Sequence, residues 1–476
     1  MTEKTAPARI RTQLTTDRKV ATQLTRNNKC SVRSQKPVFN FTVSRHFVPQ
    51  CVSKILLMMI FFGVMKSHSL YGEQWRSWRG PNGNNHAPAN TDAPLSWDIK
   101  TGHNIAWSTA IPGRGHSTPI FVGQWIFLTT SEVEKQSQSV LKLDRESGKL
   151  IDQWTIHQGT LPTRIHPNNS HASPSPVSDG THLYVCFHTE DAIWATALTF
   201  DGQILWKKRV SSYKPAAFQF GYGASPLIEE DLLIIAAEYD GEESGLYALS
   251  LEKGEPVWKL RRPQNLNFAT PIVASIAGQR QLLLAGADQL ISYDPIKGTV
   301  RWRADIGTEA ICGTVAWDDR RILFSGGNPI AGTWCVSGDG KASPLWDNNV
   351  MCYEQSLLTI KNYAFAIADN GVAYCWRTLD GITMWRQRLF GGGVSASPLL
   401  IGNRIYIASQ AGTIFVIAAS PDRFDLLAEN PSGQSIFASP VALGDRIYFR
   451  TAVGTGSERQ EFLVAAGGIS QGKPLR

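Results

Sequence analysis

The stretch LSLEKGEPVW, residues 249–258, decides the fold because its pattern returns along the chain. A charged turn in this stretch ends in Gly254, and Trp258 follows the glycine by four residues. The spacing recurs in LTFDGQILW, YDPIKGTVRW and RTLDGITMW, and looser copies are LDRESGKLIDQW and SGDGKASPLW. Self-similarity at a regular period indicates a repeat protein, in which each unit buries its apolar face against its neighbours.

A second landmark opens each repeat: a small residue, then Ser or Thr, then Pro, before an apolar run. Clear copies have Pro119, Pro174, Pro226, Pro271, Pro398 and Pro440, and degenerate copies lie at Val315 and Leu357. Runs rich in Val, Ile, Tyr and Phe follow, separated by Gly, Asn and Asp, without a sustained helical period. Four short strands in a period of about 40 to 45 residues are typical of a propeller blade. We predict an all-β, eight-bladed β-propeller of four-stranded antiparallel blades over residues 95–468.

The repeated tryptophan is expected to dock on the neighbouring blade, where its large ring and N–H hold two blades together. The glycine before it allows a tight turn. This predicts buried docking positions at Trp107, Trp154, Trp206, Trp258, Trp302, Trp346 and Trp385. The last unit lacks a tryptophan, whereas Trp107 precedes the first landmark, so an N-terminal strand should complete the eighth blade and remove open sheet edges. Residues 73–94, which contain WRSWRGPNG, are interpreted as a strap on the outside.

The repeats ALSLEKGEPVW and SYDPIKGTVRW resemble those of the pyrroloquinoline quinone (PQQ)-like propeller superfamily over about residues 95–468. This superfamily includes quinoprotein alcohol dehydrogenases and BamB-like proteins of the bacterial cell envelope. The resemblance implies the fold and leaves two functions open. One is a noncatalytic exported propeller with a scaffold or assembly role, without cofactor, metal or catalytic residues. The other is a PQQ-dependent oxidoreductase with Ca²⁺, although the adjacent cysteines that clamp the quinone in that group have no counterpart here.

Charge is concentrated at the N-terminus. Residues 1–54 hold eleven Lys and Arg against Glu3 and Asp17, which gives this segment a net charge of +9. The whole chain has a net charge of +7, so the remaining residues carry −2. A near-neutral folded part gives no reason to expect a nucleic-acid partner. Residues 1–51 are interpreted as a disordered or untranslated basic leader, because they are polar and lack apolar periodicity.

Residues 52–72 are predicted to be a signal peptide. Lys54 precedes the apolar run 55–65, which is too short for a membrane span, and Ser67 and Ser69 offer small residues for cleavage. We therefore expect export to the periplasm or cell envelope, and a membrane contact only if the signal stays uncleaved. Residues 469–476 are expected to be a C-terminal tail of a monomeric protein.

The exported part contains five cysteines, at Cys186, Cys312, Cys335, Cys352 and Cys375. An odd number gives no disulfide framework. Cys312 and Cys335 are as far apart as Cys352 and Cys375, which suggests equivalent positions in successive repeats. Buried, small apolar side chains fit this pattern better than a bridge.

Two adjacent connections are longer than the others. The distance from the tryptophan to the proline of the next landmark is 20 residues in these two connections and 11 to 13 residues in the others. The two long connections are WTIHQGTLPTRIHPNNSHASP and WKKRVSSYKPAAFQFGYGASP. Long loops on a rigid repeat often carry function, and both contain basic and aromatic residues but no Asp or Glu. We predict a positive, aromatic-lined recess near the axis for an anionic small molecule, a glycan or an envelope protein; alternatively, the loops only cover the rim. The predicted recess residues are Arg114, Arg164, His166, His171, Lys214 and Tyr222.

The inner rim offers a further set of candidates. Two residues before each Ser or Thr of the landmark stand His116, His171, Gly223, Phe268, Cys312, Glu354, Ser395 and Phe437. Histidine, cysteine and glutamate are metal ligands by type. However, Glu354 lies four blades from His171, so one shared metal site is not expected. We interpret the set as a polar rim, in which His116 and Glu354 are candidate binding residues.

Overall fold

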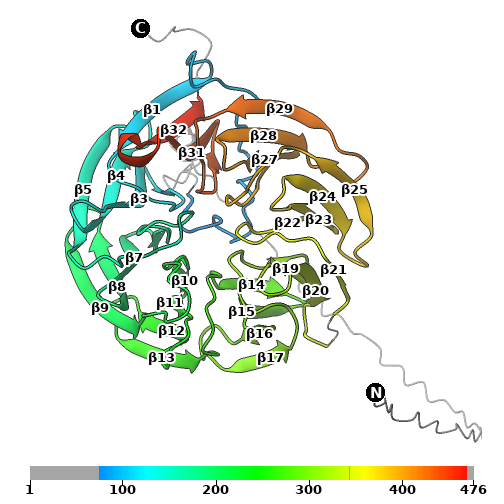
Figure 1. Ribbon diagram of the computed structural model, residues 1–476, viewed down its shortest axis with the longest axis horizontal. Coiled ribbons are helices and arrows are strands. Elements are labelled where there is room, and N and C mark those ends of the chain that lie inside the picture. Colours follow the sequence, from blue (N-terminus) through cyan, green and yellow to red (C-terminus); the bar gives the residue numbers. More distant parts are fainter. Residues whose placement is uncertain (1–73, 342–343, 469–476) are drawn as a thin grey trace, which may run out of the picture. The chain divides into compact units, whose positions relative to one another are not determined.

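The computed structural model describes residues 74–341 and 344–468. The predicted leader, signal peptide and C-terminal tail therefore lie outside the described residues. Eight four-stranded antiparallel sheets form a ring around a central axis, which confirms the predicted fold class and the number of blades (Figure 1). Among the described residues, no helix has the length and apolar character needed to cross a membrane.

Four blades follow one another in the first half of the ring, each numbered from the axis outward. Blade 1 contains β2 (Ile120–Val122), β3 (Trp125–Glu132), β4 (Ser137–Asp144) and β5 (Leu150–Gln158). Blade 2 contains β6 (Val177–Ser178), β7 (His182–Thr189), β8 (Ala192–Thr199) and β9 (Ile204–Ser212). Blade 3 contains β10 (Leu227–Glu229), β11 (Leu232–Ala237), β12 (Gly245–Ser250) and β13 (Pro256–Arg261). Blade 4 contains β14 (Ile272–Ile276), β15 (Gln279–Gly286), β16 (Gln289–Tyr293) and β17 (Val300–Ala304).

The second half repeats this order and then closes. Blade 5 contains β18 (Ala316–Trp317), β19 (Arg321–Gly326), β20 (Gly332–Ser337) and β21 (Trp346–Asn348). Blade 6 contains β22 (Leu358–Ile360), β23 (Tyr363–Ile367), β24 (Val372–Arg377) and β25 (Thr383–Arg388). Blade 7 contains β26 (Leu399–Ile401), β27 (Arg404–Ala408), β28 (Thr413–Ala418) and β29 (Leu426–Pro431). Blade 8 contains β30 (Val441–Leu443), β31 (Arg446–Val453), the short 3-10 helix η1 (Gly456–Glu458), β32 (Gln460–Gly467) and, outermost, β1 (Ile105–Ile111).

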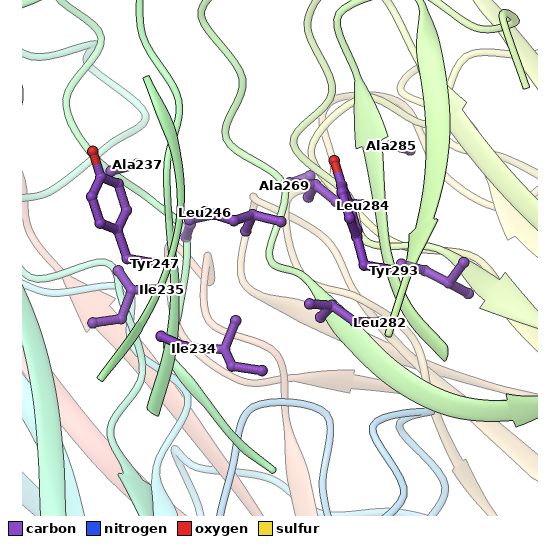
Figure 2. Packing of buried hydrophobic residues seen from close by; sticks show 14 of the residues in the cluster. Ile234, Ile235, Ala237, Leu246, Tyr247, Ala269, Leu282, Leu284, Ala285 and Tyr293 are labelled. Carbon is purple, nitrogen blue, oxygen red and sulfur yellow. The ribbon is translucent and has the colours of Figure 1, made fainter. Parts of the chain in front are cut away.

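The middle strands of the blades are apolar on both faces because each blade packs between two others. All six residues of β11 are buried, whereas the outermost strand β13 of the same blade is largely exposed. Figure 2 shows Ile234 and Leu246 pointing from blade 3 towards Leu282 of blade 4. The core therefore consists of the layers between blades, and burial of this apolar surface stabilises the ring.

Each predicted tryptophan packs against the turn of the next blade. Trp107, Trp206 and Trp346 are 9%, 7% and 9% exposed, while the other four predicted docking tryptophans are half-buried. The indole N–H of Trp206 donates to the Leu251 carbonyl at 2.8 Å, and that of Trp346 donates to the Thr378 carbonyl at 2.8 Å. These tryptophans lie at contacts between neighbouring blades, and four of the seven are less buried than expected.

The glycine of the motif has a second role beyond the tight turn. Gly254 has a φ of +66°, and a Cβ placed on it would lie 2.7 Å from Cε3 of Trp206 in the preceding blade. The same relation joins Trp107 to Gly148, Trp154 to Gly202, Trp258 to Gly298, Trp302 to Gly340 and Trp346 to Gly381. Each glycine therefore provides the flat surface on which the tryptophan of the neighbouring blade rests.

The Ser or Thr of the landmark forms a second ring of contacts close to the axis. At six of the eight blade junctions, a backbone N–H at the landmark donates to a hydroxyl of the following blade at 2.9 to 3.0 Å, and in blade 2 the residue involved is Ser175, two positions after the predicted landmark serine. These bonds run from Thr118 to Ser175, Ser175 to Ser225, Ser225 to Thr270, Thr314 to Ser356, Ser356 to Ser397 and Ser397 to Ser439. The landmark thus joins neighbouring blades at their inner edges, as the tryptophan joins them at the outer edges.

The N-terminal strand closes the ring as predicted, since β1 pairs antiparallel with β32. Trp97 fills the junction between blades 7 and 8, where it is 3% exposed and stacks on Tyr406 and Phe449. At the junction between blades 8 and 1, the buried Arg450 donates to the Thr129 carbonyl at 2.8 Å. The last and first blades are therefore joined as closely as the other pairs.

From the sequence, we placed the segment before β1 on the outside of the ring, and this prediction is wrong. Trp75 forms a bridge with Phe121 of blade 1, and Asn85 accepts from the Leu400 N–H of blade 7. Between them, the buried Arg79 donates to the Leu357 carbonyl at 3.1 Å. Residues 74–87, here called the strap, thus cross the axis, which is visible as the blue segment in the centre of Figure 1.

Candidate functional site

The inner-rim positions identified in the sequence surround an axial chamber with a volume of about 210 Å³. All of them except His171 contribute to its lining, from seven different blade connections. Trp78 of the strap also lines the chamber, together with His166, Asn168, Asn169 and Phe220 of the two long loops. The repeat thus brings one variable side chain per blade to the axis, and the strap and the long loops complete the enclosure.

Glu354 is the only Asp or Glu in the chamber lining, and no Lys or Arg accompanies it. Its carboxylate accepts from the Ser395 hydroxyl, and from Asn168 Nδ2 and Gln410 Nε2 at 3.4 Å each. Burial raises the pKa of Glu354 above 4.5, because the charged form loses hydration. Among the described residues, no cation lies within ion-pair distance of it.

His116 faces the chamber as an aromatic surface. Its ring stacks on Phe437 with a centroid distance of 4.5 Å and an interplanar angle of 12°. Burial, and then the charges of Arg114 and Arg450, hold its pKa well below 6.5. Its Nε2 has no hydrogen-bond partner among the described residues. The imidazole is therefore neutral near pH 7 and leaves one polar atom without a partner.

The predicted positive recess does not form as a single site. Tyr222 is 5% exposed and donates its hydroxyl to the Ala236 carbonyl at 2.8 Å, so it belongs to the core of blade 3. Lys214 pairs with Asp191 at 2.8 Å, an acid that the loop itself does not contain. The loops lack acids of their own, but neighbouring hairpins supply them, which sequence spacing did not reveal.

The remaining predicted residues separate into two groups. Arg114 does not line the chamber, and its Nη2 donates at 2.7 Å to the carbonyl of Pro167, which lines the cleft between the long loops. His171 belongs to the same loop, and burial lowers its pKa from 6.5. Arg164 and His166 lie on exposed loop surface instead, in a cleft of about 590 Å³ between the two long loops. Only His116, His166 and Glu354 of the predicted set line the chamber.

The two long loops, residues 159–176 and 213–226, form one surface, which we call the loop platform. Backbone and side-chain bonds join them, since the His166 N–H and Asn169 Nδ2 both donate to the Phe220 carbonyl. Phe218 and Phe220 are 52% and 36% exposed and stack with a centroid distance of 5.3 Å. His166 and Phe220 line both the chamber and the cleft, and thus separate the two cavities.

A larger cavity of about 750 Å³ lies between the strap and the inner strands of blades 2 to 4. Two of the three acids in its lining are already paired: Glu229 with Arg280 at 2.5 Å, and Asp179 with the His182 ring at 3.2 Å. Ion pairs of this kind usually stabilise the fold and leave the paired groups less available to a ligand. The chamber, which keeps an unpaired acid and an unpartnered imidazole nitrogen, is the stronger candidate site.

Sequence reasoning missed several chamber residues. Phe268 and Phe437 occupy the inner-rim position that the repeat identifies. They were not chosen as binding candidates because only polar and charged residues at that position were considered. Tyr353 adjoins Glu354 and lines the chamber, and Trp78 arrives through the strap that the sequence had placed outside. The five cysteines of the propeller are free, as expected; Cys335 and Cys375 are equivalent in β20 and β24, whereas Cys312 lines the chamber and Cys352 does not.

The chamber does not suit the quinone cofactor of the alternative function. PQQ is a tricarboxylate, and the lining presents a carboxyl group without any Lys or Arg to balance three further negative charges. Among the described residues, no group of three or more His, Cys, Asp and Glu side chains could hold a metal ion. No reaction step through this cofactor follows from the residues present.

The fold and the repeats define a class: the chain is an eight-bladed β-propeller whose repeats are similar to those of PQQ-like propellers. Within this class, residues 166–350 match the family model described as outer membrane protein assembly factor BamB. BamB of Burkholderia pseudomallei is 23% identical over 181 residues, which cover 36% of this chain and 46% of that protein. The chain thus spans about half the length of this curated relative.

Solved structures agree on the fold alone. The crystal structure of BamB from Moraxella catarrhalis has a TM-score of 0.55 at 14% identity, covering 78% of this chain and 99% of that one. The quinohemoprotein alcohol dehydrogenase of Comamonas testosteroni has a TM-score of 0.58 at 10% identity, covering 85% and 82%. Because an assembly factor and an oxidoreductase match equally well, fold similarity does not choose between the two functions.

Proposed function

We propose that this chain is a noncatalytic β-propeller of the cell envelope that binds a protein partner and acts as an assembly scaffold. The observation that carries the proposal is the match of residues 166–350 to the model of an outer membrane protein assembly factor. The matched range contains most of the loop platform. An envelope location and a protein partner rest on the same match and on the predicted signal peptide.

The loop platform is the surface through which we propose that the partner binds. Exposed aromatic residues contribute strongly to protein interfaces because they bury a large area with few rotatable bonds. Phe218 and Phe220 form such a pair beside the cleft of about 590 Å³. A partner that inserts an apolar side chain into this cleft would remove both rings from water.

The platform is well ordered before binding, which favours recognition because less conformational freedom is lost. The backbone N–H groups of Ala216 and Ala217 donate to the Asp240 carboxylate at 2.8 to 3.0 Å. Asn169 Nδ2 donates to the Phe220 carbonyl at 2.7 Å, which joins the first loop to the second. These bonds hold Phe218 and Phe220 at the surface on a fixed backbone.

Charge adds a preference to this apolar surface. Arg164 is exposed beside the cleft, and no acid pairs with it among the described residues. A partner segment with an acidic residue next to an apolar one therefore fits the platform best. Binding of such a segment weakens as salt rises, because the exposed charges are screened.

The test is capture of envelope proteins by the wild type and by two double variants. Phe218→Ala with Arg164→Ala removes the platform aromatic and its cation. Leu379→Ala with Ile382→Ala is the matched control, since these exposed apolar residues of blade 6 lie away from the platform. We expect proteins retained by the wild type and the control to be lost from the platform variant. Equal retention by all three would contradict the proposed surface.

A cellular measurement tests the assembly role itself. Removal of the protein from its source cells should lower the amounts of outer membrane proteins, and the wild-type chain should restore them, whereas the platform variant should not. The alternative function is tested on the same preparation by dye-linked alcohol oxidation with added PQQ and Ca²⁺. We expect no oxidation; turnover that depends on the quinone would overturn the noncatalytic assignment.

A further inference from the structure

We propose that the axial chamber binds a small alkylammonium cation, held among aromatic rings beside the Glu354 carboxylate. The chamber shares His166 and Phe220 with the cleft of the loop platform, but the inference rests on Glu354 and the other aromatic rings and not on the proposed protein partner. Three properties of the chamber carry it: its size, the aromatic character of its walls and the sign of its unpaired charge.

The chamber has the size of a small-molecule site. Its volume is about 210 Å³, whereas an engineered apolar cavity of about 150 Å³ is large enough to bind benzene. His166 and Phe220 line both this chamber and the cleft of the platform, so the two spaces adjoin at these side chains.

Aromatic groups from separate parts of the ring form the walls. Trp78 comes from the strap, Phe220 from a long loop, and Phe268 and Phe437 from the inner rim of blades 4 and 8. The face of an aromatic ring carries partial negative charge, and cations are attracted to several such faces at once. The neutral His116 ring stacks on Phe437 and extends this surface without adding positive charge.

The charge of the lining has one sign. Glu354 lies in the wall, and its three hydrogen-bond donors, Ser395, Asn168 and Gln410, are all neutral. A half-buried carboxyl group without a cation carries a desolvation cost that neutral donors only partly offset. A bound ammonium group would supply the missing counter-charge. An anion would be repelled, and a neutral apolar molecule would leave the carboxyl group as it is.

Several charges outside the lining bear on this reading. Arg114, Arg450 and Arg459 act on His116 from behind the wall and add positive potential, although none of them lines the chamber. Asp369 lies behind the chamber wall, where it accepts from the Tyr353 N–H at 2.9 Å, and no ion pair involves it among the described residues. It adds negative potential. Arg79 lies against the Trp78 ring at 5.8 Å but is not part of the lining, and it donates to the Leu357 and Gly83 carbonyls. The groups that face the chamber directly therefore remain one acid and several aromatic rings.

The experiment compares two probes of one shape by isothermal titration calorimetry on the purified protein. Choline carries a trimethylammonium group, and 3,3-dimethylbutan-1-ol has the same shape with carbon in place of nitrogen. We expect saturable choline binding that is at least about tenfold tighter than binding of the neutral isostere. Equal affinity for the two probes, or no saturable binding of choline, would overturn the proposal.

Variants assign the effect to the chamber. Glu354→Gln keeps the size of the side chain and removes its charge, so choline affinity should fall by about tenfold or more while the isostere is unaffected. Glu252→Gln removes the same charge from an exposed turn and is the matched control. Phe437→Leu keeps an apolar wall but removes one ring, and should weaken choline alone. Unchanged choline binding by Glu354→Gln, with an unchanged melting curve, would place any cation site elsewhere.

Discussion

The outer rim and the axial chamber are built from the same eight repeats, but the repeats are used differently in the two regions. At the rim, one tryptophan packs on one glycine of the next blade, and this contact recurs six times with little variation. At the chamber, a single repeat position holds histidine, glycine, phenylalanine, cysteine, glutamate or serine. Repetition closes the ring, and variation at one position gives the chamber a wall that differs from blade to blade.

The two regions also differ in how completely their polar atoms are satisfied. The Trp206 and Trp346 N–H groups donate to carbonyls of the next blade, whereas the Trp258 N–H has no partner among the described residues, so most but not all of the rim contacts are satisfied. In the chamber, His116 Nε2 has no partner among the described residues, and Glu354 has no counter-charge. Unsatisfied polar groups lower stability, so their presence at the axis is more consistent with binding than with folding.

The largest effect is expected at the rim. Trp206→Ala should lower the free energy of unfolding by about 3 to 5 kcal/mol, because a nearly buried ring and its hydrogen bond are lost. Trp258 is half-buried and its N–H has no partner among the described residues, so Trp258→Ala should cost about half as much. Urea unfolding followed by circular dichroism measures both. Equal losses would mean that burial at the rim does not set the contribution of each tryptophan.

The next effect separates the two roles of the rim glycine. Gly254→Ala should cost about 2 to 4 kcal/mol, because the new Cβ meets the Trp206 ring at a positive φ. Gly123 has a φ of +59° but no atom within 4 Å of an added Cβ, so Gly123→Ala should cost about 1 kcal/mol from backbone strain alone. The difference between the two melting temperatures reports the ring contact. A Gly123→Ala loss as large as that of Gly254→Ala would contradict this explanation.

The rim was predictable from the sequence and most of the binding region was not, for a physical reason. The distance from Gly254 to Trp258 repeats along the chain, and repetition is visible without coordinates. The closing strand with Trp107 was predictable too, because the last repeat lacks a tryptophan. By contrast, Lys214 meets Asp191 through a hairpin that packs beside the loop, and no spacing records that contact.

Only part of the chamber lining could be predicted from the sequence. The landmark places Glu354 and His116 at equivalent rim positions, and the structure brings both to the axis. The strap that carries Trp78 has no repeat, so nothing in its sequence indicates whether it crosses the axis or runs around the ring. Composition favoured a positive recess because basic residues dominate the long loops. The charge that faces the chamber is set instead by which side chains point inward.

A small effect on stability is expected at the chamber, in contrast with the rim. Glu354→Gln should change the free energy of unfolding by less than about 0.5 kcal/mol, or raise it, because the variant no longer buries an unpaired carboxyl group. Thermal unfolding at pH 7 measures this. A loss as large as that of Trp258→Ala would show that Glu354 supports the fold, and would remove the contrast between the two regions.

The smallest effect is the pH dependence of choline binding. The pKa of Glu354 is raised by burial, so a cation that needs the carboxylate should bind more tightly as pH rises from 4.5 through that pKa, and then reach a plateau. Other facing groups do not reverse the trend. His116 stays neutral, the thiol of Cys312 and the phenol of Tyr353 stay protonated because burial raises their pKa, and Asp369 ionises in the same direction.

His166 also lines the chamber and interacts electrostatically with Glu354, so the His166→Asn variant is compared with the wild type. Calorimetry between pH 4.5 and 7.5 should therefore show a few-fold gain in affinity for the wild type and for His166→Asn. The weak residual binding of Glu354→Gln should not vary with pH. A gain that persists in Glu354→Gln would identify Asp369 as the acid that the cation senses, and would move the charged wall of the chamber from Glu354 to Asp369.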